Sequence, residues 1–368
     1  MKSPFFYTDC SKRKGGGILR KVILTVIFSS LLFGLAGCGA NKVPENSAEM
    51  VSDAKEVTDS DMQLSMKEDH LVQKGTEQVQ AFTVDTKISE VIDDPAFGDY
   101  SRLICPVEDW YYSGDTLGNL GLTWYNNIDP DKTVEIANYM RDHAMSGDTI
   151  FYDIYTDEEK KADPDKEDTG LFFFRGNPGE RFAICNAGGG FAYVGAMQDS
   201  FPHALELSKK GYNAFALIYR PGAQTACEDL ARAISFVFEH AGELEVNTDC
   251  YSLWGGSAGA RMSAWLGSHG PAEFGGDDLP QAGAVIMQYT GHSDYTQQDP
   301  PTYACVGEND GIANWRTMES RLNVLDSFGI DTEFHKYPGL GHGFGIGTGT
   351  AAEGWLDDAV AFWEKQMS

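Results

Sequence analysis

The sequence has 368 residues, of which 42% are hydrophobic, so it can bury a sizeable core and is not disordered throughout. Its formal net charge is −27 at pH 7, and no basic cluster follows residue 21. Because nucleic-acid binding relies on clustered Lys and Arg, we expect no nucleic-acid partner.

The N-terminal segment has the features of an export signal. Basic residues within 12–21 precede an apolar run, 22–37, that is short for a bilayer span and ends in small residues. The quartet Leu35-Ala36-Gly37-Cys38 resembles the lipobox of bacterial lipoproteins, in which the cysteine carries a diacylglyceryl group and becomes the new N-terminus. We therefore expect a lipoprotein signal peptide over 1–37 and lipidation at Cys38, which would hold the chain on the outer side of the cell membrane. An ordinary secretory peptide that happens to contain a cysteine is the alternative.

Two segments of different composition follow. Residues 39–81 contain no aromatic residue and are dominated by Glu, Asp, Lys, Ser and Gln, so we interpret 38–81 as the lipidated cysteine and a disordered tether. Residues 82–148 contain many aromatics and glycines with little clear periodicity over 95–130. We expect this stretch to be an irregular N-terminal extension packed on the core, the alternative being that it shapes a substrate pocket.

The pattern becomes regular from Asp131, where an N-capped helix passes through Val134 and Met140. Strands are expected at 149–155, 171–175, 181–186, 213–219, 250–254, 284–289, 302–306 and 332–337, and helices near 200–210, 225–241, 258–267 and 352–366. Strands that alternate with helices predict an α/β fold, with a mostly parallel central sheet and helices on both faces. We assign 149–368 to this catalytic domain.

Cysteines and motifs indicate no metal or cofactor. Cys10 is expected to be removed with the signal peptide, and Cys38 is expected to carry lipid. Five cysteines remain, an odd number: Cys105, Cys185, Cys227, Cys250 and Cys305. Cys185 and Cys305 lie in apolar strand-like runs, where a thiol acts as a small hydrophobe, so we expect no disulfide framework. The sequence has no zinc-site cysteine spacing, no His-Glu-x-x-His and no Gly-x-x-x-x-Gly-Lys.

The segment Gly255-Gly256-Ser257-Ala258-Gly259 contains the pattern Gly-x-Ser-x-Gly. It follows the apolar run 251–254 and precedes the helix-compatible 260–266, which is the strand–turn–helix setting of a nucleophile elbow. At such a turn the serine hydroxyl points outward, while glycines let strand and helix pack closely. Ser257 is therefore the candidate nucleophile, and a plain Gly-Ser turn is the alternative.

A serine hydroxyl needs a base, and the base needs an acid that orients it. His342 follows the last expected strand in a glycine-containing loop and is the candidate base, whereas His335 lies inside that strand and is expected to be structural. The acid should follow a strand between the serine and the base. Asp310, in the turn after 302–306, meets this condition, and Glu308 in the same turn remains the rival acid.

An anionic tetrahedral intermediate requires N–H donors aimed at it. One should be the amide of Ala258, because the free N–H groups at a helix N-terminus favour an anion. The second should come from the loop 186–191, whose three consecutive glycines allow close backbone approach. A structural turn is the alternative for this loop.

Together these residues resemble the α/β-hydrolase superfamily, and within it secreted or lipid-anchored esterase/lipase-like proteins related to acetyl-xylan, feruloyl and hormone-sensitive-lipase-type esterases. The resemblance covers about 170–368. It implies an α/β-hydrolase fold with Ser257 as nucleophile, His342 as base, Asp310 as orienting acid, and Gly189, Gly190 and Ala258 as oxyanion donors. One departure is Ala187, which stands where the lipase-type motif has a histidine before the three glycines.

The leading hypothesis is a serine carboxylic-ester hydrolase that works through an acyl-enzyme, without a cofactor, on short-chain or carbohydrate esters at the cell surface. An exported serine peptidase or amidase would use the same three side chains. A lipoprotein that only binds a ligand on a hydrolase scaffold is the third hypothesis. Acyl-chain length, alcohol and oligomeric state do not follow from the sequence.

Overall fold

The computed structural model describes residues 80–108, 110–125 and 127–368. The expected signal peptide, Cys38 and the tether up to residue 79 lie outside the described residues. The described residues belong to one compact unit, Gly75–Ser368. No helix in this described part has both the length and the apolar character needed to span a membrane.

One eight-stranded sheet forms the centre, in the order β10-β9-β8-β7-β5-β6-β4-β3. Its strands are β3 (Phe151–Tyr152), β4 (Gly170–Phe174), β5 (Arg181–Asn186), β6 (Asn213–Ile218), β7 (Asn247–Gly256), β8 (Ala284–Gln288), β9 (Thr302–Gly307) and β10 (Thr332–Tyr337). From β6 to β10 all neighbours pair in parallel, whereas β4 and β3 add antiparallel pairs at one edge. The prediction of a mostly parallel sheet is confirmed.

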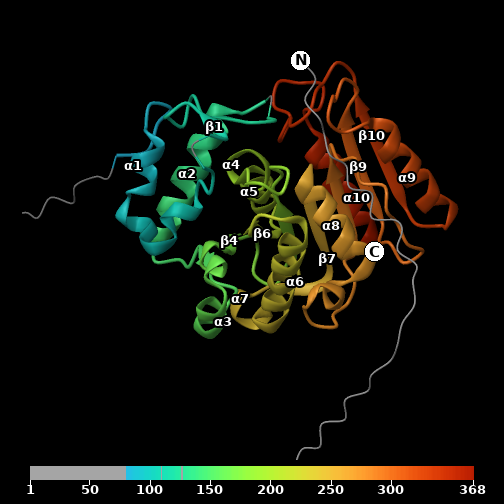
Figure 1. Ribbon diagram of the computed structural model, residues 1–368, viewed down its shortest axis with the longest axis horizontal. Helices are drawn as coiled ribbons and strands as arrows, with labels where there is room; N and C mark the ends of the chain where they lie inside the picture. Colours follow the sequence, from blue (N-terminus) through green and yellow to red (C-terminus); the bar gives the residue numbers. More distant parts are fainter. Residues whose placement is uncertain (1–79, 109, 126) are drawn as a thin grey trace, which may run out of the picture. The chain divides into compact units, whose positions relative to one another are not determined.

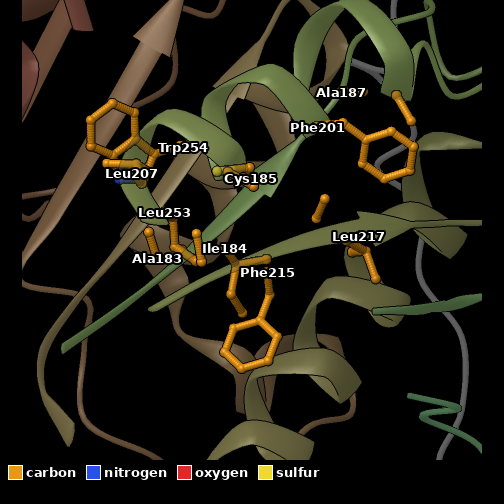
Figure 2. Packing of buried hydrophobic residues seen from close by; sticks show 14 of the residues in the cluster. Ala183, Ile184, Cys185, Ala187, Phe201, Leu207, Phe215, Leu217, Leu253 and Trp254 are labelled. Carbon is orange, nitrogen blue, oxygen red and sulfur yellow. The ribbon is translucent and has the colours of Figure 1, made fainter. Parts of the chain in front are cut away.

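The central strands are buried on both faces, which explains their continuous apolar sequences. Figure 2 shows buried side chains of this core, among them Ile184 and Cys185 of β5 and Phe215 of β6. Successive residues of a strand point to opposite faces, so Leu253 and Trp254 of β7 serve two separate layers. Trp254 packs against Trp355 and Trp363 of the last helix, with ring centroids 6.2 and 6.4 Å away.

Helices cover both faces of the sheet. They are α3 (Asp157–Ala162), α4 (Ala196–Asp199), α5 (Phe201–Lys209), α6 (Ala223–Glu239), α7 (Ala241–Leu244), α8 (Ala258–His269), α9 (Trp315–Ser327) and α10 (Trp355–Gln366), with 3-10 turns η2 (Pro164–Asp168) and η3 (Pro271–Phe274). In Figure 1, α6 and α8 lie side by side in front of the strands, and the fainter α10 lies behind them. This is the two-layer covering that the alternating pattern predicts.

The N-terminal extension contains α1 (Ile88–Ile92), η1 (Pro95–Leu103), the short antiparallel pair β1 (Tyr112–Ser113) and β2 (Gly121–Leu122), and α2 (Pro130–Met145). Its buried side chains, such as Phe97 and Ile136, belong to the same hydrophobic cluster as the sheet. Helix α2 packs against η1 and against α5. The extension therefore has no core of its own.

Several expected boundaries differ from the structure by two or three residues, and helix α9 was not expected. Two of the differences have a plain physical cause. Helix α2 begins at Pro130 and is capped by Asp129, which accepts from the amides of residues 131 and 132, because a proline at the first helical position needs no donor partner. The strand expected over 149–155 shortens to β3, since the Asp153 side chain accepts from the amide of Tyr155 and turns the chain toward α3. As predicted, Cys185 and Cys305 are fully buried.

Candidate active site

Ser257 stands alone between β7, which ends at Gly256, and α8, which begins at Ala258. Its backbone has φ 51° and ψ −112°, a region that a residue with a side chain seldom adopts. A β-carbon on Gly259 would lie 2.0 Å from the carbonyl oxygen of Asn186, so only glycine permits this approach of helix to strand. The predicted strand–turn–helix setting is thus confirmed, with the serine in a strained turn.

Two loops from neighbouring strands bring an imidazole and a carboxylate to this serine. Nε2 of His342 lies 3.1 Å from Oγ of Ser257, and Nδ1 lies 2.8 Å from Oδ2 of Asp310. The other oxygen of Asp310 accepts from the amides of Ile312 and Ala313 at 2.8 and 2.7 Å. The Asp310 side chain is 0% exposed and that of His342 is 6% exposed, so solvent hardly screens their contact.

The rival acid and the second histidine of this region are engaged elsewhere. Glu308 is exposed and accepts from Nζ of Lys336 at 2.9 Å. His335 lies in β10 with Nε2 2.6 Å from Glu333. Asp310, and not Glu308, is therefore the carboxylate that contacts His342, and His335 is tied to its own strand.

The glycine loop lies directly against the serine. A β-carbon on Gly188 would lie 2.9 Å from Cβ of Ser257 and 3.0 Å from the carbonyl oxygen of Gly256, so no side chain fits between the loop and the serine. Gly189 and Gly190 have φ values of 128° and 64°, which turn the chain so that the carbonyl of Gly189 accepts from the amide of Ala192. Among the described residues, none accepts a hydrogen bond from the amides of Gly189, Gly190 or Ala258. These three amides remain available to an anion near Ser257.

No sequence pattern indicates a role for Asp199, a fully buried residue at the end of α4 that holds this loop in place. Its Oδ2 accepts from the amide of Gly188 at 2.7 Å and from the Tyr125 hydroxyl at 2.8 Å. Its Oδ1 accepts from the Tyr289 hydroxyl at 2.5 Å. Burial, and after it the charge of Asp199, raises the pKa of Tyr125 and Tyr289 well above the ordinary value, so both phenols stay protonated donors. Three donors thus compensate one buried carboxylate.

The extension reaches this site through Trp124 and Tyr125. The Tyr125 hydroxyl joins Asp199, and the Trp124 carbonyl would lie 2.5 Å from a β-carbon on Gly343, the residue after His342. In addition to packing on the core, the extension therefore contacts the buried carboxylate behind the glycine loop and the loop that carries His342. Ala187, at the position of the lipase-type histidine, is buried, and its carbonyl accepts from the Tyr219 hydroxyl at 2.6 Å.

A strained serine at a strand–helix turn, with an acid and a histidine on later loops of a mostly parallel sheet, defines the α/β-hydrolase fold. In sequence, residues 180–279 match the model of the BD-FAE family. The match includes the glycine loop and Ser257 and ends before Asp310 and His342. No curated protein matches the chain.

Solved structures to which this chain is similar include hydrolases. They include an alpha/beta hydrolase enzyme from a Medee basin deep-sea metagenome library (21% identity, 54% of this chain and 92% of that chain, TM-score 0.46). An acetyl ester-xyloside bifunctional hydrolase from Caldicellulosiruptor lactoaceticus has 19% identity over 54% of this chain and 88% of that chain, with a TM-score of 0.47. A propionate-bound thermophilic esterase from Thermogutta terrifontis has 21% identity over 54% and 89%, with a TM-score of 0.46.

Proposed function

We propose that this chain is a serine carboxylic-ester hydrolase with Ser257 as nucleophile, His342 as general base and Asp310 as the acid that orients it. The observation that carries the proposal is the unbroken contact from Oγ of Ser257 through the imidazole to a buried carboxylate. The strained φ of Ser257 and the available amides beside it add independent support.

In the proposed reaction, Oγ of Ser257 attacks the ester carbonyl carbon while Nε2 of His342 takes the hydroxyl proton. The oxyanion forms against the amides of Ala258, Gly189 and Gly190. The bond to the alcohol oxygen then breaks, and His342 returns the proton to the leaving alcohol. Water, deprotonated by the same imidazole, hydrolyses the acyl-enzyme and regenerates the serine.

A fluorophosphonate probe and paired chromogenic substrates test this proposal with the purified protein. The wild type should be labelled and should hydrolyse p-nitrophenyl acetate, whereas Ser257→Ala should lose the label and about 10⁴-fold or more in turnover. Ser327→Ala, on α9, is the matched control and should behave like the wild type. Faster cleavage of aminoacyl p-nitroanilides than of acetate would favour a peptidase or amidase, and an unlabelled, inactive wild type would favour a non-catalytic ligand-binding protein.

We also propose that the enzyme is held at the outer face of the cell membrane by acyl chains on Cys38. The support is the sequence alone: residues 1–37 are basic and then apolar and end in Leu-Ala-Gly, directly before Cys38. Cells fed an alkyne fatty acid should label the wild type and not Cys38→Ser. Equal labelling of the two proteins would overturn the proposed anchor.

A further inference from the structure

Helix α8 and the serine before it leave one stripe of residues partly uncovered. Ser257, Arg261 and Trp265 are half-buried and recur every four residues, whereas the residues between them are buried. The Arg261 amide donates to the carbonyl of Ser257 at 3.2 Å. Because residues four apart share a helix face and helical side chains lean toward the N-terminus, the Arg261 side chain extends toward the serine. A guanidinium group therefore lies about one helical turn from the proposed nucleophile.

Two aromatic rings border this guanidinium group. Cζ of Arg261 lies 5.9 Å from the ring centroid of Trp265, which stacks on Phe191 with centroids 6.3 Å apart and an interplanar angle of 19°. Phe191 follows Gly190, one of the candidate oxyanion donors, and has a strained φ of 60°. The Gly222 amide donates to the Phe191 carbonyl at 2.8 Å and helps to hold that backbone. We call Phe191, Arg261 and Trp265 the guanidinium cluster, and it lies beside the oxyanion loop.

The Arg261 guanidinium has neither an ion pair nor a hydrogen-bond acceptor among the residues that the structure describes. The chain has 55 acidic residues against 28 Lys and Arg, so carboxylates are plentiful, and Arg220 binds Asp229 at 2.7 Å. The carboxylate of Asp294 contacts Nε1 of Trp265 at 3.5 Å and does not pair with Arg261. A half-buried guanidinium in this setting suits a carboxylate supplied by a ligand, because its planar fork offers two parallel donors.

We propose that Arg261 binds a carboxylate at the far end of the acyl half of the ester, so that half-esters of short dicarboxylic acids are the favoured substrates. The inference rests on the proposed function above. One helical turn is about 5.4 Å, so a carboxylate a few methylene groups from the ester carbonyl reaches the guanidinium while Ser257 attacks. This carboxylate is bound and not changed. Only the ester bond breaks, and the acyl half leaves as a dicarboxylate.

The groups around His342 place the alcohol half on a different side. His342 returns the proton to the leaving alcohol, so the alcohol must lie next to it. The His342 ring lies 5.0 Å from the ring of Tyr289, and the backbone of Gly343 lies against the Trp124 carbonyl. Among the described residues, the rings of the guanidinium cluster contact neither Tyr289 nor Trp124. The acyl half is therefore the part of the ester that faces Arg261.

The net charge of the chain favours a monoanion over a polyanion at this position. At −27 the molecule repels every approaching negative charge, whereas Arg261 offers one short-range contact. A phosphate or a polycarboxylate would meet the repulsion with each charge and gain the contact only once. A single carboxylate is thus the ligand that this guanidinium suits best.

Two pairs of esters test the inference, and within each pair a terminal methyl group is replaced by a carboxylate. Monomethyl glutarate and methyl pentanoate differ in the acyl half, whereas acetoxyacetate and ethyl acetate differ in the alcohol half. Each pair shares its other half, so a change in the ratio of its kcat/KM values reports on the carboxylate. Arg261→Met keeps an apolar side chain and removes the charge. It should lower the glutarate-to-pentanoate ratio about tenfold and leave the acetate ratio within about threefold of the wild type.

Arg316→Met is the matched control, because that guanidinium also lies over a tryptophan ring, Trp315, at 4.1 Å. Both ratios should stay unchanged in this variant. Arg261→Lys keeps the charge and loses the planar fork, so it should restore part of the glutarate ratio. An unchanged glutarate ratio in Arg261→Met would overturn the inference. A loss confined to the acetoxyacetate pair would also overturn it, because the carboxylate would then lie on the alcohol half.

Titration calorimetry separates a failure of this inference from a failure of the proposed function. Ser257→Ala should bind monomethyl glutarate, and Arg261→Met added to it should weaken that binding about tenfold. A wild type that hydrolyses none of the esters, while binding of monomethyl glutarate still depends on Arg261, would contradict the proposed function alone. Equal binding by the two Ser257→Ala proteins, with normal hydrolysis of methyl pentanoate by the wild type, would contradict the inference alone.

Discussion

The sheet-based half of the molecule and the N-terminal extension contribute to the site in different ways. The half from β4 onward supplies Ser257, Asp310 and His342 from loops at one edge of parallel strands, where the topology itself brings loop residues together. The extension supplies rings and a phenol from a short irregular segment around β2. Under the proposed function, the scaffold carries the reacting groups, and the added segment contacts the loops that hold them.

The two regions meet at Asp199. This carboxylate binds Tyr125 of the extension, Tyr289 after β8 and the amide of Gly188 beside the serine. A change in the extension can therefore reach the oxyanion loop through a single buried group. The predictions below therefore test how strongly a substitution in one region changes the other region through Asp199.

The largest loss of activity is expected within the scaffold, at Asp310, the acid that orients His342. Asp310→Asn should lower kcat by about 10³- to 10⁴-fold, because an amide cannot stabilise the imidazolium and favours the wrong tautomer of His342. Glu308→Gln, two residues earlier and paired with Lys336, is the matched control and should stay within about threefold of the wild type. Steady-state kinetics with p-nitrophenyl acetate decides between them. A severe loss in Glu308→Gln with a mild one in Asp310→Asn would reverse the assignment.

A smaller loss is expected where the regions join. Both oxygens of Asp199 accept hydrogen bonds, so in Asp199→Asn the amide NH₂ must face a donor whichever way it turns. The displaced glycine loop should then cost about 10²-fold in kcat, with a smaller change in KM.

Exposed Asp277 provides the control for this prediction, since Asp277→Asn changes the same charge on the surface. The melting temperature should be recorded beside the kinetics. If Asp199→Asn lowered the melting temperature and left kcat intact, the carboxylate would serve only folding, and the coupling between the two regions would be absent.

How well the sequence predicts each region follows from what specifies it. The elbow and the glycine loop are local motifs set between regular elements, and Asp310 and His342 each follow an expected strand, so spacing and period reveal them. Asp199 is an acidic residue in a short helix, and its partners Tyr125 and Tyr289 lie 74 and 90 positions away. No local pattern marks such a contact. Ring contacts such as that of Trp124 with Tyr193 are missed for the same reason, because composition shows many rings without showing which of them stack.

The scaffold should also dominate the acid sensitivity of the fold. Burial, and after it Arg321, lowers the pKa of His292 from 6.5 to about 3, and burial lowers the pKa of His203 as well. Below pH 6.5 these two histidines bind protons in the unfolded chain but stay neutral in the folded chain. The contribution of these neutral histidines to the free energy of unfolding is therefore fully present above about pH 6.5 and is lost as the pH falls toward 3. For His292 the loss is about 1.4 kcal/mol per pH unit.

Urea unfolding between pH 5 and pH 7 measures this loss, which should reach about 2 kcal/mol at pH 5 from His292 alone. His292→Leu removes the titrating group, whose Nε2 has no hydrogen-bond partner in the described part of the chain, and should give a shallower pH dependence. His269→Leu replaces an exposed histidine of α8 and should keep the wild-type slope. Equal slopes in all three proteins would contradict the prediction.

The smallest expected effect lies in the extension and asks whether it folds with the sheet. Asp129 caps α2, and Asp129→Ala should lower the free energy of unfolding by about 1 kcal/mol. Because the extension shares one hydrophobic cluster with the sheet, the whole unit should still unfold in a single transition, shifted by a few degrees. Far-ultraviolet circular dichroism and tryptophan fluorescence should therefore melt together. A separate early transition in Asp129→Ala, with tryptophan fluorescence changing first, would make the extension an independently folding part, and the joint core described above would not be a cooperative one.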